Sequence, residues 1–122
     1  MDARAIVTTL WRRFDERRFE ETRPLFADDF IADWPQTRER ILGPDNFIQL
    51  NRAYPGAWRC HLKDVVVDGD RAVTEVEITD GEQVVHAASF FTLKDGKIVR
   101  AREFFADPGD PPFDRSRWTE RY

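Results

Sequence analysis

The sequence has little from which a covalently cross-linked or membrane-bound architecture could be built. It contains one cysteine, Cys60, so no disulfide can form within the chain. No apolar run approaches the roughly 20 residues that a membrane-spanning helix needs. The first residues carry charges on both sides of a short apolar stretch, unlike a secretion signal. We therefore expect a cytoplasmic protein with no membrane partner.

An excess of basic residues is missing as well. The chain has 19 Lys and Arg against 23 Asp and Glu, which gives a net charge of −4 with both signs spread along it. A nucleic-acid partner is therefore not expected. Glycine-rich phosphate loops, serine-elbow motifs and helical His-Glu zinc motifs are also lacking, so we expect no cofactor.

Aromatic residues, by contrast, are plentiful, with ten Phe and four Trp among the 122 residues. Aromatic side chains bury large areas, which favours a core or a cavity rich in rings. The chain length is typical of one domain. We expect a single domain over residues 1–122.

The N-terminal half shows helical spacing of its apolar residues. A stripe within residues 2–18 predicts a helix with Asp2 as its N-cap, and it consists of Ile6, Val7, Leu10, Trp11 and Phe14. A shorter helix is predicted over 19–27, and a third begins at Pro44 and stops at Pro55-Gly56. Between them we expect a short strand over residues 30–34 and a polar loop over 36–43.

The C-terminal half changes to a period of two. Three Asp-Gly pairs, beginning at Asp68, Asp80 and Asp95, divide it into four strands of an antiparallel meander. The fold class is therefore α+β, with three N-terminal helices packed on an antiparallel sheet. Residues 107–122 are expected to form an extended C-terminal flap, because its large aromatic residues would otherwise be exposed.

The turn types fix which strand residues share a face. With a glycine bulge in the first and third turns and a two-residue type I′ turn in the second, one face is apolar and lies under the helices. It collects Trp58, Cys60, Leu62, Val66, Ala72, Thr74, Val76, Ile78, Val85, Ala87, Ser89, Phe91, Leu93, Val99, Ala101, Glu103 and Phe105. The opposite face collects Arg59, His61, Lys63, Val73, Glu75, Glu77, His86, Phe90, Arg100 and Arg102. Its expected cross-strand pairs are Glu77 with Arg59 and Glu75 with His61.

Glu103 is the one acid in the interior of the apolar face, and Ser89 lies one strand away on that face. Burial disfavours the charged form of a carboxyl group and moves its pKa toward the range of a general acid or base. Glu103 and Ser89 are therefore the candidate catalytic residues. In the alternative interpretation Glu103 is structural and pairs with Arg115 or Arg117, which would fasten the C-terminal flap.

A ring of aromatic residues beside Glu103 would suit a small apolar ligand. The candidate ligand-binding residues are Trp11, Trp34, Gln36, Arg40, Tyr54, Trp58 and Cys60. Ordinary core packing and solvated loop positions are the alternatives for these residues. On the opposite face, the expected register aligns His61, Glu75 and His86, which are possible zinc ligands. A glutamate bridging two ordinary histidines is the favoured interpretation, so no metal is predicted.

The order of elements, with LKDGKIVRAREFF in the last hairpin, resembles the SnoaL-like branch of the nuclear transport factor 2-like (NTF2-like) superfamily over nearly the whole chain. The segments ADWPQTRERILGPDNFIQLNRAYPGAW and DVVVDGD resemble an uncharacterised bacterial subfamily. This resemblance implies a cone in which helices pack on a bent antiparallel sheet. It also implies a homodimer that packs through the outer sheet face.

Function follows from the resemblance only in outline, because the superfamily includes isomerases, cyclases, hydrolases and non-catalytic modules. Glu103 stands where SnoaL-like cyclases carry a catalytic aspartate. The histidine that partners this aspartate in those cyclases would lie near Ser89, and a serine cannot act as that base. The acid-arginine set of limonene-epoxide-hydrolase-like relatives is not reproduced, since Arg100 and Arg102 are expected to face outward. The sequence predicts a small-molecule-binding protein with isomerase, cyclase or hydrolase chemistry through Glu103, or alternatively a non-catalytic ligand-binding or dimeric interaction module.

Overall fold

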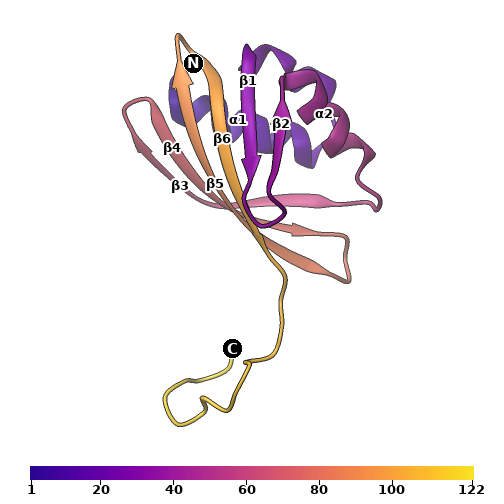
Figure 1. Ribbon diagram of the computed structural model, residues 1–122, viewed down its shortest axis with the longest axis vertical. Helices are drawn as coiled ribbons and strands as arrows, with labels where there is room; N and C mark the ends of the chain where they lie inside the picture. The colour runs from indigo at the N-terminus through magenta and orange to yellow at the C-terminus, as the bar shows by residue number, and fades with distance from the viewer.

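The computed structural model describes residues 1–122, and helices pack against one side of a six-stranded sheet (Figure 1). In chain order the elements are α1 (Ala3–Asp15), the 3₁₀-helix η1 (Glu20–Leu25), β1 (Phe26–Trp34), β2 (Glu39–Leu42), α2 (Pro44–Ala53), β3 (Arg59–Asp68), β4 (Arg71–Thr79), β5 (Val84–Lys94) and β6 (Lys97–Ala106). This architecture confirms the predicted α+β class. Neither α-helix is long and apolar enough to span a bilayer.

The first helix begins where its cap residue predicts. The backbone N–H of Ala5 donates a hydrogen bond of 2.8 Å to the Asp2 carboxylate, which satisfies one of the free donors at the start of α1. The helix ends at Asp15, three residues before the predicted end. Arg17 has a φ of 60°, a left-handed conformation that no α-helix can continue through.

The predicted second helix is a 3₁₀-helix rather than an α-helix. Pro24 lies inside η1, and proline has no N–H to donate to a continuing helical ladder. The chain is already extended at Phe26, so β1 starts four residues before the predicted strand at Phe30. The structure therefore has two α-helices and one 3₁₀-helix in place of three equivalent helices.

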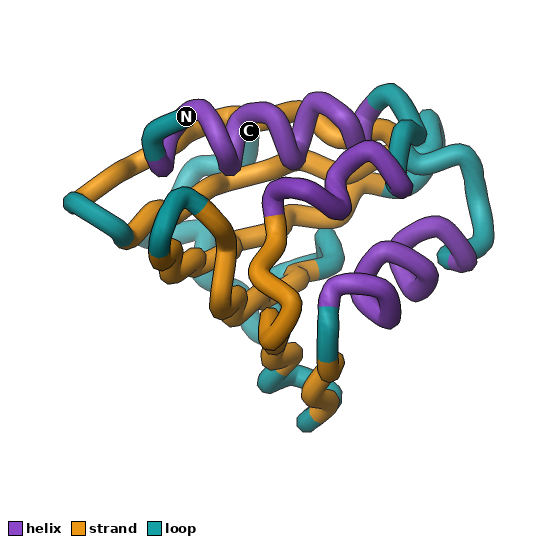
Figure 2. Tube along the Cα trace, turned by 90° about the horizontal axis from the view of Figure 1, so that it is seen from above, coloured by secondary structure: helices purple, strands orange, loops and turns teal.

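The sheet has the strand order β2-β1-β6-β5-β4-β3 and is mixed. The meander from β3 to β6 is antiparallel, as predicted, but β1 pairs in parallel with β6. The predicted loop over residues 36–43 contains β2, which pairs antiparallel with β1 and buries Ile41. Figure 2 shows the helices on one side of the curved sheet. We call the sheet face under the helices the inner face and the opposite one the outer face.

At two irregularities in the strand pairing, the residues lie on the sheet face opposite to the predicted one. A register shift between Leu62 and Asp64 turns Val65 and Val67 inward and leaves Val66 59% exposed. A second shift lies between Thr92 and Leu93, where Val99 of β6 is left without a partner. It buries Ile98 completely, where the prediction had placed Val99. Each bulge adds one residue to its strand and inverts the alternation beyond it.

The predicted pairs on the outer face are also wrong, by two residues. Glu77 pairs with His61 in β3 and with His86 in β5, and Glu75 pairs with Asp64 instead of His61. In the β4–β5 pairing the shift comes from the second turn, a four-residue loop in which the Asp80 carboxylate accepts the backbone N–H groups of residues 82 and 83. The row of possible zinc ligands therefore contains Glu77, and no cluster of three His, Cys, Asp or Glu side chains is placed to hold a metal ion.

The core is a cluster of rings between α2, η1 and the sheet. Phe47 of α2 is 1% exposed, and its ring centroid lies 6.2 Å from that of Phe14, 5.7 Å from Phe26 and 5.2 Å from Phe30. The prediction of an aromatic core is confirmed. The rings fix α2 against one end of the inner face.

The C-terminal segment, residues 107–122, has no helix or strand and runs away from the body of the molecule (Figure 1). Its aromatic side chains are not covered within the single chain, since Phe113 is 62% and Trp118 is 72% exposed. The flap is extended, but it does not fold back onto the sheet.

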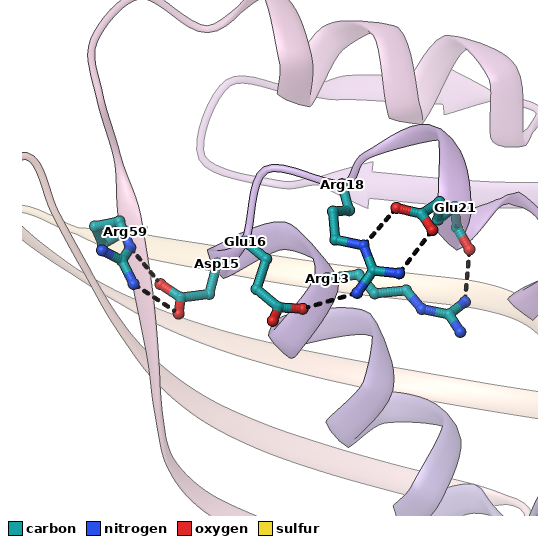
Figure 3. A network of polar contacts seen from close by, with 6 residues as sticks. All are labelled: Arg13, Asp15, Glu16, Arg18, Glu21 and Arg59. Atoms are coloured by element: carbon teal, nitrogen blue, oxygen red, sulfur yellow. Dashed lines mark hydrogen bonds and ion pairs between the residues drawn. The ribbon is translucent and has the colours of Figure 1, made fainter.

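Charged residues at the end of α1 join the helix to the rim of the sheet (Figure 3). The Asp15 carboxylate accepts two hydrogen bonds from the Arg59 guanidinium, at 2.9 and 3.1 Å, and one of 3.0 Å from the backbone N–H of Cys60. These bonds, led by those from Arg59, hold the pKa of Asp15 below its usual value. On the other side of the turn, Arg18 donates to Glu16 and Glu21.

We expect Asp15→Asn to lower the free energy of unfolding by about 1 kcal/mol, because Arg59 is exposed and only part of the network is shielded from water. Chemical denaturation of both proteins at pH 7 measures this difference in the free energy of unfolding. Because the pKa of Asp15 is lower in the folded state, this stabilisation is complete above about pH 4 and is lost as the pH falls further. Glu16→Gln, in a more exposed pair, is the control and should leave the unfolding midpoint unchanged.

Candidate functional site

A row of polar side chains crosses the middle of the inner face. The strand register places Thr74 of β4 beside Ser89 of β5, and Ser89 beside Glu103 of β6. The parallel pairing of β1 with β6 brings Trp34 to the far side of Glu103. The three polar residues are between 0% and 2% exposed, although the residues around them are apolar. The predicted inward position of Glu103 and Ser89 is therefore observed.

Two neutral donors hold the Glu103 carboxyl group. Ser89 Oγ donates to Oε2 at 2.6 Å, and the Trp34 indole Nε1 donates to Oε1 at 3.1 Å. No arginine pairs with it. Arg115 and Arg117 instead lie over the rings of Phe113 and Trp118 within the C-terminal segment, so a salt bridge from that segment is excluded as the anchor of Glu103.

The surroundings of Glu103 disfavour its charged form. Burial raises the pKa of Glu103 above its ordinary value, and the hydrogen bonds from Ser89 and Trp34 act in the opposite direction without cancelling that effect. The carboxyl group therefore keeps its proton to a higher pH than an exposed glutamate does. In that state it is a neutral acid that can donate a hydrogen bond or a proton.

A second tryptophan meets the other end of the polar row. The indole Nε1 of Trp11, on α1, donates to Thr74 Oγ1 at 3.0 Å, and Trp11 is 5% exposed. This contact makes Trp11 a buried link between α1 and β4. The row thus runs between two indoles, one deep in the core and one, Trp34, only partly buried.

The remaining predicted ligand-binding residues are divided between two regions. Trp58 is partly buried and donates from Nε1 to the Pro55 carbonyl at 2.7 Å, and Cys60 follows it on the inner face. Tyr54 ends α2 and is 55% exposed. Gln36 is exposed in the turn before β2, and Arg40 donates to the Asp33 carboxylate at 2.7 and 3.2 Å. The structure does not bring Gln36 or Arg40 to the polar row.

Cys60 is a packed thiol and not a prepared nucleophile. Burial, followed by the negative charge of Asp15, raises its pKa to about 12. A thiol nucleophile needs the thiolate form, which this environment suppresses. Its contribution to the inner face is therefore apolar.

Two hollows on the surface lie away from Glu103. One of about 330 Å³ is lined by Ala27, Asp28, Asp29, Lys94, Asp95, Lys97 and Val99. The other, of about 340 Å³, is lined by Glu20, Arg23, Asp45, Ile48, Gln49 and Arg52. Neither borders Ser89 or Trp34. Thr74, Ser89 and Glu103 are each no more than 2% exposed, so the polar row is closed to solvent in this conformation.

The sequence matches the SnoaL-like domain over residues 7–101, which runs from the first half of α1 to the middle of β6. The chain belongs to the SnoaL-like family. A search of curated proteins finds no match. The helices and the curved sheet of this SnoaL-like protein agree with the resemblance found in its sequence.

Solved structures agree with this assignment. The SnoaL-like chain is 30% identical to a proposed ketosteroid isomerase from Kribbella flavida, with a TM-score of 0.90 over 98% of this chain and 88% of that one. It is 28% identical to an NTF2-like protein of unknown function from Burkholderia xenovorans, with a TM-score of 0.84 over 98% and 94% of the two chains. A proposed SnoaL-like polyketide cyclase from Jannaschia, 21% identical with a TM-score of 0.66 over 82% and 84%, shares the fold.

The hydrogen bonds of two members of the polar row were not predicted from the sequence. Thr74 was placed on the inner face, but its hydrogen bond with Trp11 joins residues 63 positions apart. Trp34 was named as a ligand contact, whereas its indole binds Glu103 directly. An inward tryptophan on the strand beside a buried acid was the available signal, but the pairing of β1 with β6 was not predicted.

Proposed function

We propose that this SnoaL-like protein binds a small, uncharged, apolar molecule against the inner face of its sheet, where Glu103 exchanges a proton with it. The observation that carries the proposal is the buried carboxyl group, held by Ser89 and Trp34 with no cation beside it. A carboxyl group with a raised pKa, close to an apolar wall, is suited to acid-base chemistry on a carbonyl compound. Isomerisation, cyclisation and hydrolysis all use such a step.

The absence of buried positive charge supports an uncharged ligand. The buried polar or charged residues are Thr9, Thr22, Thr74, Ser89 and Glu103, and none of them can neutralise a carboxylate or a phosphate. The partly buried side of the site is aromatic, since Trp34 and Phe105 make an edge-to-face contact with centroids 5.3 Å apart. Such a wall favours ring-bearing ligands. Trp34 connects the buried acid to the surface, and its displacement would open the site.

A second candidate function is supported by the closed state of the site. Both oxygens of Glu103 accept hydrogen bonds, and the side chain is 2% exposed. In this case Glu103 is a structural acid that ties β1, β5 and β6 together. The protein would then be a non-catalytic ligand-binding or interaction module.

We also propose that two copies pair through their outer sheet faces. Along the ladder, Ala88 of β5 lies between Glu75 of β4 and Phe104 of β6, and Phe90 lies between Val73 and Arg102. A two-fold axis along β5 would place β4 of each copy over β6 of the other, with Glu75 over Phe104 and Val73 over Arg102. Phe104, which is 40% exposed, would be covered by this contact.

The proton-transfer proposal is tested with β-tetralone, an uncharged bicyclic ketone, by following exchange of its acidic C–H protons in heavy water by proton NMR. We expect saturable exchange with the wild-type protein. Glu103→Gln should reduce the catalysed rate by about 10²-fold or more, because the amide cannot accept or release the proton. Glu82→Gln, in the exposed β4–β5 loop, is the matched control and should exchange like the wild type.

Two outcomes separate the candidates. If β-tetralone binds and exchange is equally fast with Glu103→Gln, Glu103 is not the proton-transfer group. If β-tetralone causes neither exchange nor changes in the proton spectrum of the wild-type protein, the structural interpretation gains support. Native mass spectrometry of the purified protein then identifies any small molecule that it retains.

A further inference from the structure

The C-terminal arm, defined as residues 107–122, has a local structure of its own. Asp114 Oδ1 accepts hydrogen bonds from the backbone N–H and the hydroxyl group of Ser116, at 3.0 and 2.7 Å. The backbone N–H of Trp118 donates to the Arg115 carbonyl at 2.9 Å. These contacts form a turn that presents Trp118 in a defined position. The arm is therefore more than an unstructured extension.

No polar contact joins the arm to the body of its own chain. Its hydrogen bonds and its ion pair, between Arg121 and Asp110, all lie within the arm. Phe113 and Trp118 are 62% and 72% exposed, with guanidinium groups 5.6 and 5.8 Å from their ring centroids. Clustered exposed aromatic and arginine side chains are typical of protein interfaces.

Part of the arm has a counterpart in a crystal structure. The alignment with the Kribbella flavida protein covers 98% of this chain and so extends into the arm. Residues 1–106 make up about 87% of the chain, so the body alone could not produce the TM-score of 0.90. Part of the arm must superpose too. A projecting segment that keeps its place without polar contacts to its own body is typically held by another molecule.

The arm continues directly from the strand that borders the proposed pairing surface. Phe104 faces outward on β6, and the arm begins three residues later at Asp107. The seven steps from Ala106 to Phe113 can span up to about 23 Å. Two sheets packed face to face lie only about 10 Å apart. An arm that starts at the end of β6 in one sheet therefore has the length to reach the other.

We propose that the C-terminal arm of each copy packs against a second copy of this chain and buries Phe113 and Trp118 there. The proposal rests on the outer-face pairing described above and adds a second contact to it. The arm supplies the aromatic and arginine side chains that usually dominate binding energy at interfaces. Because each copy gives one arm and receives one, the contact is made twice in the dimer.

The full-length chain and a Phe113→Ser, Trp118→Ser double variant are compared by sedimentation equilibrium over a range of concentrations. We expect a dimer for the wild type and at least a ten-fold higher dissociation constant for the double variant. Glu120→Gln, in the same arm, is the control and should dimerise like the wild type. Circular dichroism checks that the double variant keeps its fold, since the altered side chains lie outside the core.

A photo-crosslinking phenylalanine analogue in place of Trp118 identifies what the arm touches. Covalent dimers on irradiation are the expected result. Crosslinks confined to one chain would mean that the arm closes on its own body, which overturns the proposal. If the wild type is a dimer and the double variant has the same dissociation constant, the arm contact is disproved and the outer-face pairing still stands. A wild type that stays monomeric overturns both, and Phe104→Lys tests the outer face independently.

Discussion

Replacing Phe47 with alanine should lower the free energy of unfolding by about 3–5 kcal/mol. Phe47 is the centre of the aromatic cluster, with the rings of Phe14, Phe26 and Phe30 all within 6.2 Å of it, and it is 1% exposed. Its removal deletes a ring and leaves a cavity that three rigid neighbours cannot fill. It also detaches α2 from α1 and β1 together.

Chemical denaturation at neutral pH measures this loss. Leu42→Ala is the matched control, because Leu42 lies on the neighbouring strand β2 and is 61% exposed. That change should alter stability by no more than about 0.5 kcal/mol. A Phe47→Ala protein as stable as the Leu42→Ala protein would mean that the ring cluster does not hold α2 in place.

The predicted faces of the sheet were mostly right because alternation is a local property. Ala72 to Ile78 and Val85 to Leu93 alternate without interruption, so their inward residues could be read directly from the sequence. Residues 65–67 are three consecutive valines, which fit either face. Ile98 and Val99 pose the same ambiguity, so neither bulge left a signal in the hydrophobic pattern.

The parts of the fold that were missed depend on contacts between distant segments. β2 is four residues long and has a single buried side chain, Ile41, so its own sequence resembles a loop. It becomes a strand because β1 offers an open edge. The parallel pairing of β1 with β6 joins residues about 70 positions apart, and no turn specifies it.

In the candidate site too, contacts between neighbouring strands could be predicted and contacts between distant segments could not. Ser89 and Glu103 belong to consecutive strands joined by an Asp-Gly turn, so their approach on the inner face could be predicted. The bond from Trp34 to Glu103 needs the unpredicted pairing of β1 with β6. The proposed arginine partners were wrong because the segment that carries Arg115 and Arg117 runs away from the body instead of covering it.

The stability of the wild-type protein relative to Glu103→Gln should fall as the pH rises above the ordinary pKa of glutamate, about 4.5. Below that pH the carboxyl group is protonated in both the folded and the unfolded chain, so the difference between the two proteins is constant. Above it the unfolded chain releases the proton, while burial raises the pKa of Glu103 in the folded chain and keeps the proton bound. The folded state then holds more protons, and its stability decreases with pH.

The size of this effect is about 1.4 kcal/mol for each pH unit over which Glu103 stays protonated only in the folded chain. Glutamine keeps the acceptor for the Trp34 indole and offers an N–H to Ser89, so the variant removes the ionisation and retains the hydrogen bonds. Denaturation curves of both proteins from pH 4 to pH 8 measure the difference, in which all other titrating groups cancel. A difference that stays flat or grows in favour of the wild type would mean that the buried acid is not disfavoured in its charged form, and the basis for proton transfer by Glu103 would be lost.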